Sequence, residues 1–298
     1  MREPRMSMSM SPEPPSDPKN RGAALYRLLA WLSPGFPVGA FSYSHGLEAA
    51  AAAGMAHDSA TLQGWIAAIV VRGSGRIDAD ILRDAYHAAE AGDRTALDAA
   101  NQRGCAFRAT AELALEASQQ GEAFLRTCLA AWPDAFFETW AAPRPNPLPA
   151  SGERGSSARP RLAIPRLAVG EREDVAQAER CVPSPRLRGE GQGEGPFHAG
   201  VCHSAVFGAA AARAGIPLND ALIGYLQAFA ANLMSAGLRL GLIGQTDGQR
   251  ILAALEPNIA EAAAAATARD PADFGAATFA VDLASMAHET QYSRLFRS

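Results

Sequence analysis

The longest regular pattern in the chain runs from Leu218 to about Leu240, and its period is that of an α-helix. Large apolar side chains recur every three or four residues and share one face: Leu218, Leu222, Tyr225, Phe229, Leu233 and Leu240. A second face is lined by small residues, which let another helix come close: Gly224, Ala228, Ala231 and Ser235. Asn232, Ser235 and Arg239 form a polar line. A helix this apolar needs neighbours on most sides, so the pattern predicts packed helices.

Shorter segments with the same period fill most of the remaining chain. We expect helices over residues 22–33, 46–53, 59–73, 77–91, 95–118, 121–132, 199–214, 247–257, 259–269 and 279–292, and a short aromatic-rich segment over residues 134–140. Glycines and prolines at their ends set these limits, with Pro257 ending one helix and Thr246 capping its start. Alanine is abundant and only 7% of residues are aromatic, which favours helices. The prediction is an all-α fold, a single compact domain of about ten helices.

Two stretches depart from the helical pattern. Residues 1–21 are rich in Pro, Ser and Met, and we expect a disordered tail there. Residues 143–196 are dense in Pro, Gly, Arg and Glu and lack periodicity, which predicts a disordered insertion within the helical domain 22–298. Such an insertion costs little because loop-closure entropy grows slowly with length. The alternative is that residues 143–196 form a regulatory or binding arm.

Composition excludes several classes of function. The net charge of −4 gives no indication of a nucleic-acid surface. Lys19 is the only lysine, so the folded part has no Walker A, Schiff-base or kinase lysine. The four cysteines show no CxxC pairing, which favours a reduced, cytoplasmic protein over a disulfide framework. No signal peptide and no apolar run of about 18 residues is apparent, so we expect no membrane span.

The most unusual loop is residues 32–48, LSPGFPVGAFSYSHGLE. Pro34 and Pro37 forbid a helix through it. The loop nevertheless carries large apolar side chains: Phe36, Val38, Phe41, Tyr43 and Leu47. It must bury this surface either against its own domain or against a partner.

No catalytic set emerges from the sequence. Ser42, Ser44 and His45 are neighbours in the chain, whereas a nucleophile needs a base that a third group orients. A metal site is conceivable at His198, Cys202 and His203, because the first two would share a face if residues 199–214 and their flank are helical. The alternative is that Cys202 is a buried thiol. We expect no resident metal and no cofactor.

The last residues, QYSRLFRS, are unusually apolar for a chain end. Tyr292, Leu295 and Phe296 share a face if this segment is helical, with Arg294 and Arg297 beside them. Tyrosine and arginine are common anchors at protein interfaces, so the segment is typical of one that docks on a partner. The alternative is that it packs on its own core.

Three blocks of the chain resemble the urease accessory protein UreF family: SPGFPVGAFSYSHGLE, NLMSAGLRLGLIGQTDGQRILAALEP and SMAHETQYSRLFRS. The resemblance implies an all-α, generally dimeric protein that is not an enzyme and that serves urease maturation. Its partners would be UreD (UreH in some systems), the GTPase UreG and apo-urease, into which nickel is inserted. The tail would contact UreD through Tyr292, Arg294, Leu295, Phe296 and Arg297. The blocks assign to family-specific structure or to UreG contact Tyr43, Glu48, Arg239, Gln245 and Gln249.

Two other hypotheses remain open at this point. The chain could carry nickel directly on His198, Cys202 and His203. It could also activate UreG by donating an arginine such as Arg239 or Arg297. The segment 143–196 lies outside the resemblance, so it bears on assembly rather than on the fold.

Overall fold

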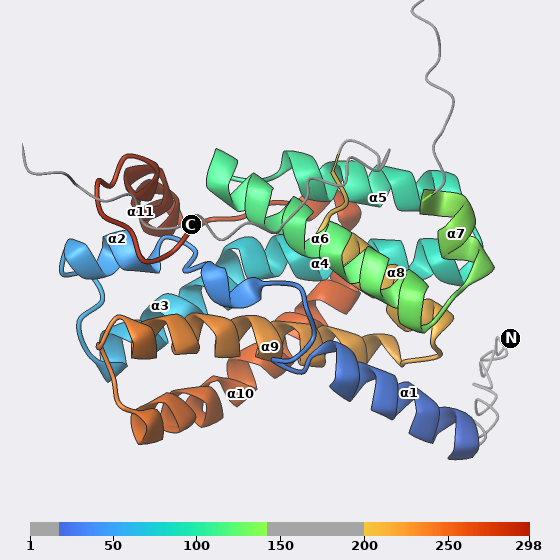
Figure 1. Ribbon diagram of the computed structural model, residues 1–298, viewed down its shortest axis with the longest axis horizontal. Helices are drawn as coiled ribbons and strands as arrows, with labels where there is room; N and C mark the ends of the chain where they lie inside the picture. The colour runs from blue at the N-terminus through green and yellow to red at the C-terminus, as the bar shows by residue number, and fades with distance from the viewer. Residues whose placement is uncertain (1–17, 142–199) are drawn as a thin grey trace, which may run out of the picture. The chain divides into compact units, whose positions relative to one another are not determined.

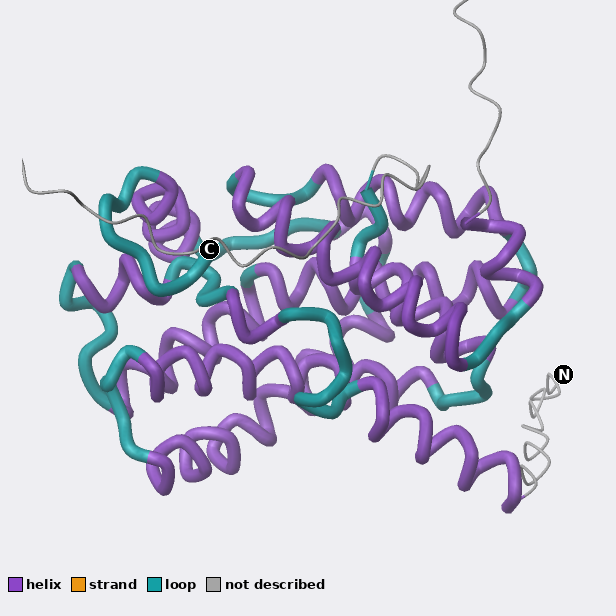
Figure 2. The backbone as a smooth tube through the Cα atoms, viewed as in Figure 1, coloured by secondary structure: helices purple, strands orange, loops and turns teal. Residues whose placement is uncertain are grey.

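A computed structural model describes residues 18–141 and 200–298. This part contains eleven α-helices, two short 3₁₀ helices and no strand, so the predicted all-α class is confirmed (Figures 1 and 2). The predicted insertion at 143–196 and most of the predicted tail lie outside the described residues. Helix α1, Pro18–Trp31, begins inside the stretch that we expected to be tail, with a proline in the first turn, where its missing N–H costs nothing.

Helix α4, Ser74–Glu90, lies at the centre of the helical packing. It contacts five others: α3, Ser59–Arg72; α5, Arg94–Ala106; α8, His203–Arg213; α9, Leu218–Arg239; and α10, Gln245–Ala268. Helix α8 packs most closely against α4. A Cβ added at Gly208 of α8 would lie 2.2 Å from the carbonyl oxygen of Leu82, so only glycine permits this crossing.

Other side chains come close to helix α9 at two glycines, Gly224 of the predicted small face and Gly237, which lies outside it. A Cβ at Gly224 would lie 2.7 Å from Leu32, which directly follows α1, and one at Gly237 would lie 2.4 Å from Leu62 of α3. Among the described helices α9 alone is long and apolar enough to cross a membrane. Leu222, Leu226 and Leu233 are fully buried in the protein core, which accounts for that apolar character.

The predicted boundary between residues 95–118 and 121–132 is wrong. The chain breaks at 107–110 instead, where the Thr110 hydroxyl accepts from Leu113 N and caps α6, Ala111–Ala131. Gly121 lies inside α6, because the backbone of Val201 crosses there and a Cβ would meet its carbonyl oxygen at 1.8 Å. The short helix α7, Ala135–Ala141, follows.

Helix α10 joins the two predicted helices 247–257 and 259–269 into one, so the predicted end at Pro257 and the predicted cap at Thr246 are wrong. It begins at Gln245 with no side-chain cap, and it continues through Pro257 to Ala268. Buried Ile251 and Leu255 before the proline, and Ile259 and Ala263 after it, continue one face of a single helix. Packing along this face outweighs the backbone hydrogen bond that the proline removes.

The loop 32–48 buries most of its apolar surface against its own domain. Phe36 packs on Phe124 at a centroid distance of 5.3 Å, and Tyr43 is 2% exposed. Phe41, in the 3₁₀ helix Ala40–Ser42, stays 69% exposed. Helix α2, Leu47–Ala52, then approaches α11, Phe279–Glu289, so closely that a Cβ at Gly46 would lie 2.9 Å from Ser285 N. A second 3₁₀ helix, Pro271–Asp273, precedes α11.

Candidate functional site

The C-terminal tail folds back on the protein beside α2 and α11 (Figure 1). It is not helical, so the predicted shared face does not form. Phe296 points inward and is 4% exposed, whereas Leu295 is 62% exposed and Tyr292 is fully exposed. The backbone pairs with the loop 32–48: Arg297 N donates to Ser42 O, and Ser44 N donates to Ser298 O, both at 2.8 Å. The tail therefore presents some side chains to solvent while others anchor it.

Glu48 holds the backbone of the tail. One carboxylate oxygen accepts from Leu295 N at 2.7 Å, and the other accepts from Phe296 N at 2.9 Å. Glu48 lies in the first turn of α2 and is 9% exposed, so water does not compete strongly for these bonds. The Nε2 atom of His288 lies 3.3 Å from the same carboxylate.

His288 connects the tail to helix α6. Its ring is fully buried, and its Nδ1 lies 2.6 Å from Glu112 in the first turn of α6. Glu112 also pairs with Arg294 of the tail. In return, Glu289 at the end of α11 accepts from Ala111 N at 2.9 Å, which satisfies a free donor at the α6 N-terminus. We call the contacts of the tail with Glu48, Glu112 and His288 the clasp.

Arg239, the last residue of α9, covers the inward side of the tail. Its guanidinium lies 4.3 Å from the ring centroid of Phe296, which is cation–π distance, and it donates to Phe41 O. Asn232 of the same polar line donates to Tyr43 O at 3.4 Å. Partial burial lowers the pKa of Arg239, which remains charged at neutral pH.

Tyr43 closes the other side of the tail. Its hydroxyl donates to Gln119 at 2.5 Å, and Arg297 donates to the same amide oxygen at 3.5 Å. Burial raises the pKa of Tyr43, against the hydrogen bond to Arg297, which lowers it. Three sequence-predicted residues, Tyr43, Glu48 and Arg239, therefore meet the tail in one place.

Gln245 and Gln249 do not join this cluster. Both are exposed in the first turns of α10, and within the described parts of the chain neither has a hydrogen bond to the tail. The sequence reasoning missed His288, Glu112 and Gln119, although His288 stands inside the third block. A single histidine on a helix does not by itself indicate a buried connection.

The serine and histidine of the loop 32–48 do not form a nucleophile and base pair. Ser44 Oγ donates to Ser298 O rather than to His45. His45 lies with its Nε2 2.6 Å from Ser74 and its Nδ1 3.5 Å from Glu116. Ser298 Oγ donates to Glu116 at 2.8 Å, so this buried polar cluster also fixes the tail.

The nickel hypothesis loses its geometric premise. His198 lies outside the described residues, and α8 begins at His203, so Cys202 precedes the helix that was to align it. Cys202 is fully buried, and its Sγ accepts from Arg108 at 3.1 Å. His203 packs against the rings of Phe124 and Tyr225, and burial lowers its pKa to about 4. Across 18–141 and 200–298, no group of three or more His, Cys, Asp or Glu could hold a metal ion.

Comparison with known proteins decides the family. The family model described as UreF matches residues 56–256, which is more than half of the chain. The chain belongs to the UreF family. Three relatives are each named urease accessory protein UreF. The protein of Granulibacter bethesdensis is 40% identical over 276 residues, 93% of this chain and 94% of the relative. That of Rhodopseudomonas palustris strain BisA53 is 41% identical over 276 residues, with the same coverage.

The third relative extends the match over nearly the whole chain. The protein of Azorhizobium caulinodans is 38% identical over 293 residues, 98% of this chain and all of the relative. At 98% coverage of this chain, the match includes the loop 32–48, α9 and α10. The clasp is the local structure in which the tail of this UreF family chain meets the starts of α2 and α6 and the end of α11.

Proposed function

We propose that this chain is an accessory protein of urease maturation that acts as a scaffold rather than as an enzyme. With a UreD (UreH) partner it recruits the GTPase UreG and regulates it, so that nickel enters apo-urease. The proposal rests on membership of the UreF family and on the names of its relatives. We place this role in the cytoplasm and expect the chain to act as a homodimer.

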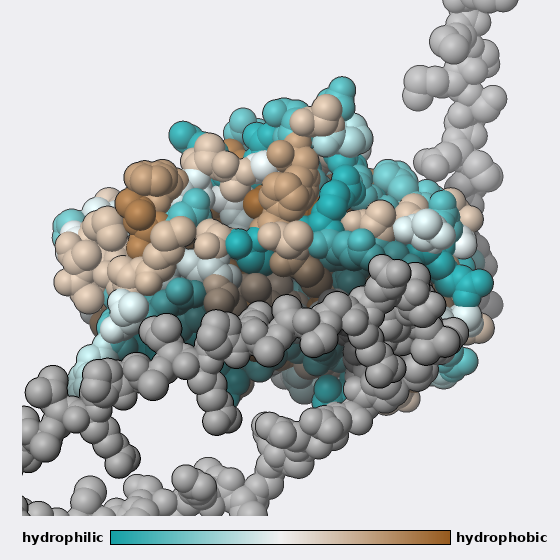
Figure 3. Space-filling view, turned by 90° about the horizontal axis from the view of Figure 1, so that it is seen from above, coloured by the Kyte–Doolittle hydropathy of each residue, from teal (hydrophilic) through white to brown (hydrophobic). Residues whose placement is uncertain are grey.

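The observation that carries the proposal is an exposed apolar surface beside the clasp. Phe279, Leu283 and Met286 stand on one face of α11 at i, i+4 and i+7, and they are 77%, 48% and 48% exposed. The exposed Tyr292 and Leu295 follow them in the tail. Figure 3 shows hydrophobic residues gathered at this end of the molecule. Contiguous apolar surface of this kind is typical of protein–protein interaction sites.

We assign this surface, α11 with the tail, to the UreD partner. The clasp supports the assignment because it fixes the tail backbone and leaves Tyr292 and Leu295 free for contact. Arg294 and Arg297, also exposed, supply charge at the edge of the surface. Phe296 serves as the anchor that sets the position of these side chains.

We assign the exposed face of α10 near Gln245 and Gln249 to UreG. A scaffold regulates a GTPase if it binds its nucleotide states with different affinity, and it needs no catalytic group of its own. An arginine donated to UreG is less well supported, because Arg239 is engaged by Phe41 and Phe296. Arg297 lies beside Tyr43 and donates a weak hydrogen bond to Gln119.

The test is co-expression with UreD from the same organism, followed by size-exclusion chromatography with light scattering. Four forms are compared: the full chain, a chain lacking residues 291–298, the double variant Leu283→Ser with Met286→Ser, and the control Leu115→Ser. Leu115 is 48% exposed on α6, so the control has a matched change in polarity.

We expect a stable complex with the full chain and with Leu115→Ser, and none with the other two. No complex with the full chain would contradict the proposed function. A complex with the truncated chain or the double variant would show that this surface is not the UreD site.

A further inference from the structure

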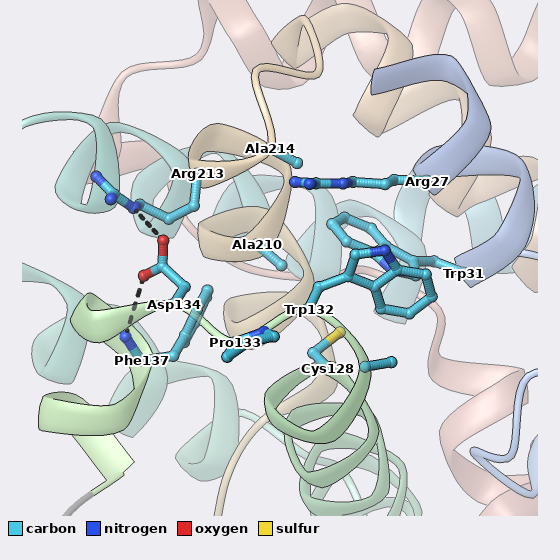
Figure 4. A pocket seen from close by; sticks show the side chains of 11 residues that line it. Arg27, Trp31, Cys128, Trp132, Pro133, Asp134, Phe137, Ala210, Arg213 and Ala214 are labelled. Atoms are coloured by element: carbon cyan, nitrogen blue, oxygen red, sulfur yellow. Dashed lines mark hydrogen bonds and ion pairs between the residues drawn. The ribbon is translucent and has the colours of Figure 1, made fainter. Parts of the chain in front are cut away.

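A pocket of about 250 Å³ lies on a different part of the molecule from the clasp. It is formed by α1, by the end of α6 and the residues that follow, and by α8 (Figure 4). No residue of the pocket takes part in the bonds that hold the tail. The proposed scaffold function does not use it.

The walls of the pocket are aromatic and held in place. The rings of Trp31 and Trp132 meet edge to face at a centroid distance of 6.0 Å. Trp31 is 5% exposed and also packs against Phe124 and Phe207. Phe36 stacks on the ring of Trp132 at 6.4 Å. These contacts fix both indoles before any ligand arrives, which reduces the entropy lost on binding.

Part of the remaining lining is small or apolar. Ala210 and Ala214 of α8 leave the space open, and Phe137 contributes another aromatic ring. Cys128 also lines the pocket, and burial raises the pKa of its thiol to about 12, so it stays neutral. A flat apolar group is the natural occupant of such a space.

Two arginines and one aspartate line the pocket, and only one of the arginines is paired with the aspartate. Arg213 pairs with Asp134 at 3.2 Å and lies over the ring of Phe136. Asp134 is further occupied by the amide of Phe136, at 2.9 Å. Arg27 extends from α1 in the direction of Ala214 (Figure 4), and no hydrogen bond or ion pair of Arg27 occurs in the described parts of the chain. Among the described residues, one positive charge at the pocket therefore has no acidic partner.

We propose that this pocket binds a small aromatic carboxylate. The ring would lie against the two indoles, and Arg27 would donate to the carboxylate in the two-pronged geometry that guanidinium favours. The volume is slightly below the range of about 300–1,000 Å³ for drug-sized ligands, which limits the ligand to one or two rings.

The probe is 1-naphthoate, titrated into the full chain while tryptophan fluorescence is followed. Its amide, 1-naphthamide, has the same shape without the charge. Arg27→Gln removes the proposed anion partner and keeps most of the side chain. Arg126→Gln is the matched control, since Arg126 is exposed on α6 and does not line the pocket. Ala214→Trp fills the pocket directly.

We expect saturable binding of 1-naphthoate to the wild type and to Arg126→Gln. Both Arg27→Gln with 1-naphthoate and the wild type with 1-naphthamide lack the charge-assisted hydrogen bond. In each case binding should be weaker by roughly tenfold or more. Ala214→Trp should abolish binding while the helical circular dichroism is retained. Absence of saturable binding, equal binding of acid and amide, or full binding to Arg27→Gln or to folded Ala214→Trp would each overturn the proposal.

Discussion

Glu48 offers the sharpest test of how the tail is held. Its carboxylate accepts the amides of Leu295 and Phe296 and contacts His288, all with little access to water. Glu48→Ala removes both acceptors and leaves a buried N–H and the Nε2 atom of the buried His288 without a partner, while Nδ1 of His288 keeps Glu112. The tail should then detach from the domain much more often, although Phe296 keeps its contact with Arg239.

The size of the effect follows from these contacts. A hydrogen bond to a charged group contributes about 1.5–3 kcal/mol. The amide of Leu295 lies nearer to solvent, so water can replace Glu48 there, while the amide of Phe296 cannot be rescued in this way. We therefore expect a loss of about 3 kcal/mol in the free energy of tail opening, which is roughly a 100-fold change in the opening constant.

The assay is amide hydrogen exchange read by mass spectrometry on peptides that cover residues 290–298. Peptides from the core helix α9 serve as the internal reference for global stability. Glu256→Ala is the control, because Glu256 is exposed on α10. If tail exchange in Glu48→Ala stays within about threefold of the wild type, the carboxylate does not hold the tail and the reasoning fails.

Two further predictions concern the fold. Gly208→Ala should lower the free energy of unfolding by about 1–3 kcal/mol or more, because its Cβ would lie 2.2 Å from the Leu82 carbonyl oxygen. The matched change Gly64→Ala, with nothing within 4 Å, should raise it by up to about 1 kcal/mol; urea unfolding measures both, and equal effects would contradict the packing argument. His203, whose pKa burial lowers from 6.5 to about 4, is neutral in the folded protein, so the unfolded state binds a proton first as pH falls. Stability should be full above pH 6.5 and fall by at most about 3 kcal/mol between pH 6.5 and 4, whereas His203→Gln should show a shallower slope in urea midpoint against pH.

The helices could be predicted from the sequence wherever one apolar face decides the packing. The spacing of Leu62, Ile66 and Ile69 defines α3, and Asp58 caps its start. Prediction fails where a distant segment decides. Gly121 looks like a helix end, and only the crossing of Val201 explains why it lies inside one. The apolar spacing across Pro257 was visible, but its packing partners were not.

The candidate site shows the same limit. The three blocks identify Tyr43, Glu48, Arg239 and the tail, and the structure places them together. The blocks do not indicate which side chains of the tail face inward, because that depends on Glu48 fixing a non-helical backbone. A helical tail would put Leu295 and Phe296 near each other on one face, whereas in the non-helical tail Phe296 is 4% exposed and Leu295 is 62% exposed.

Because Phe296 is buried and Leu295 is exposed, the tail could connect two partners that bind different parts of the protein. Phe296 touches Arg239, the last residue of α9, and Gln245 begins α10 only six residues later. A protein that binds Tyr292 and Leu295 therefore binds a segment that also contacts the α9–α10 corner, through Phe296 and Arg239. The proposed UreG surface lies just beyond that corner. Coupling requires that the tail and the corner have two arrangements that both partners bias, and the exchange rates of the tail and of residues 240–250 measured together would reveal it.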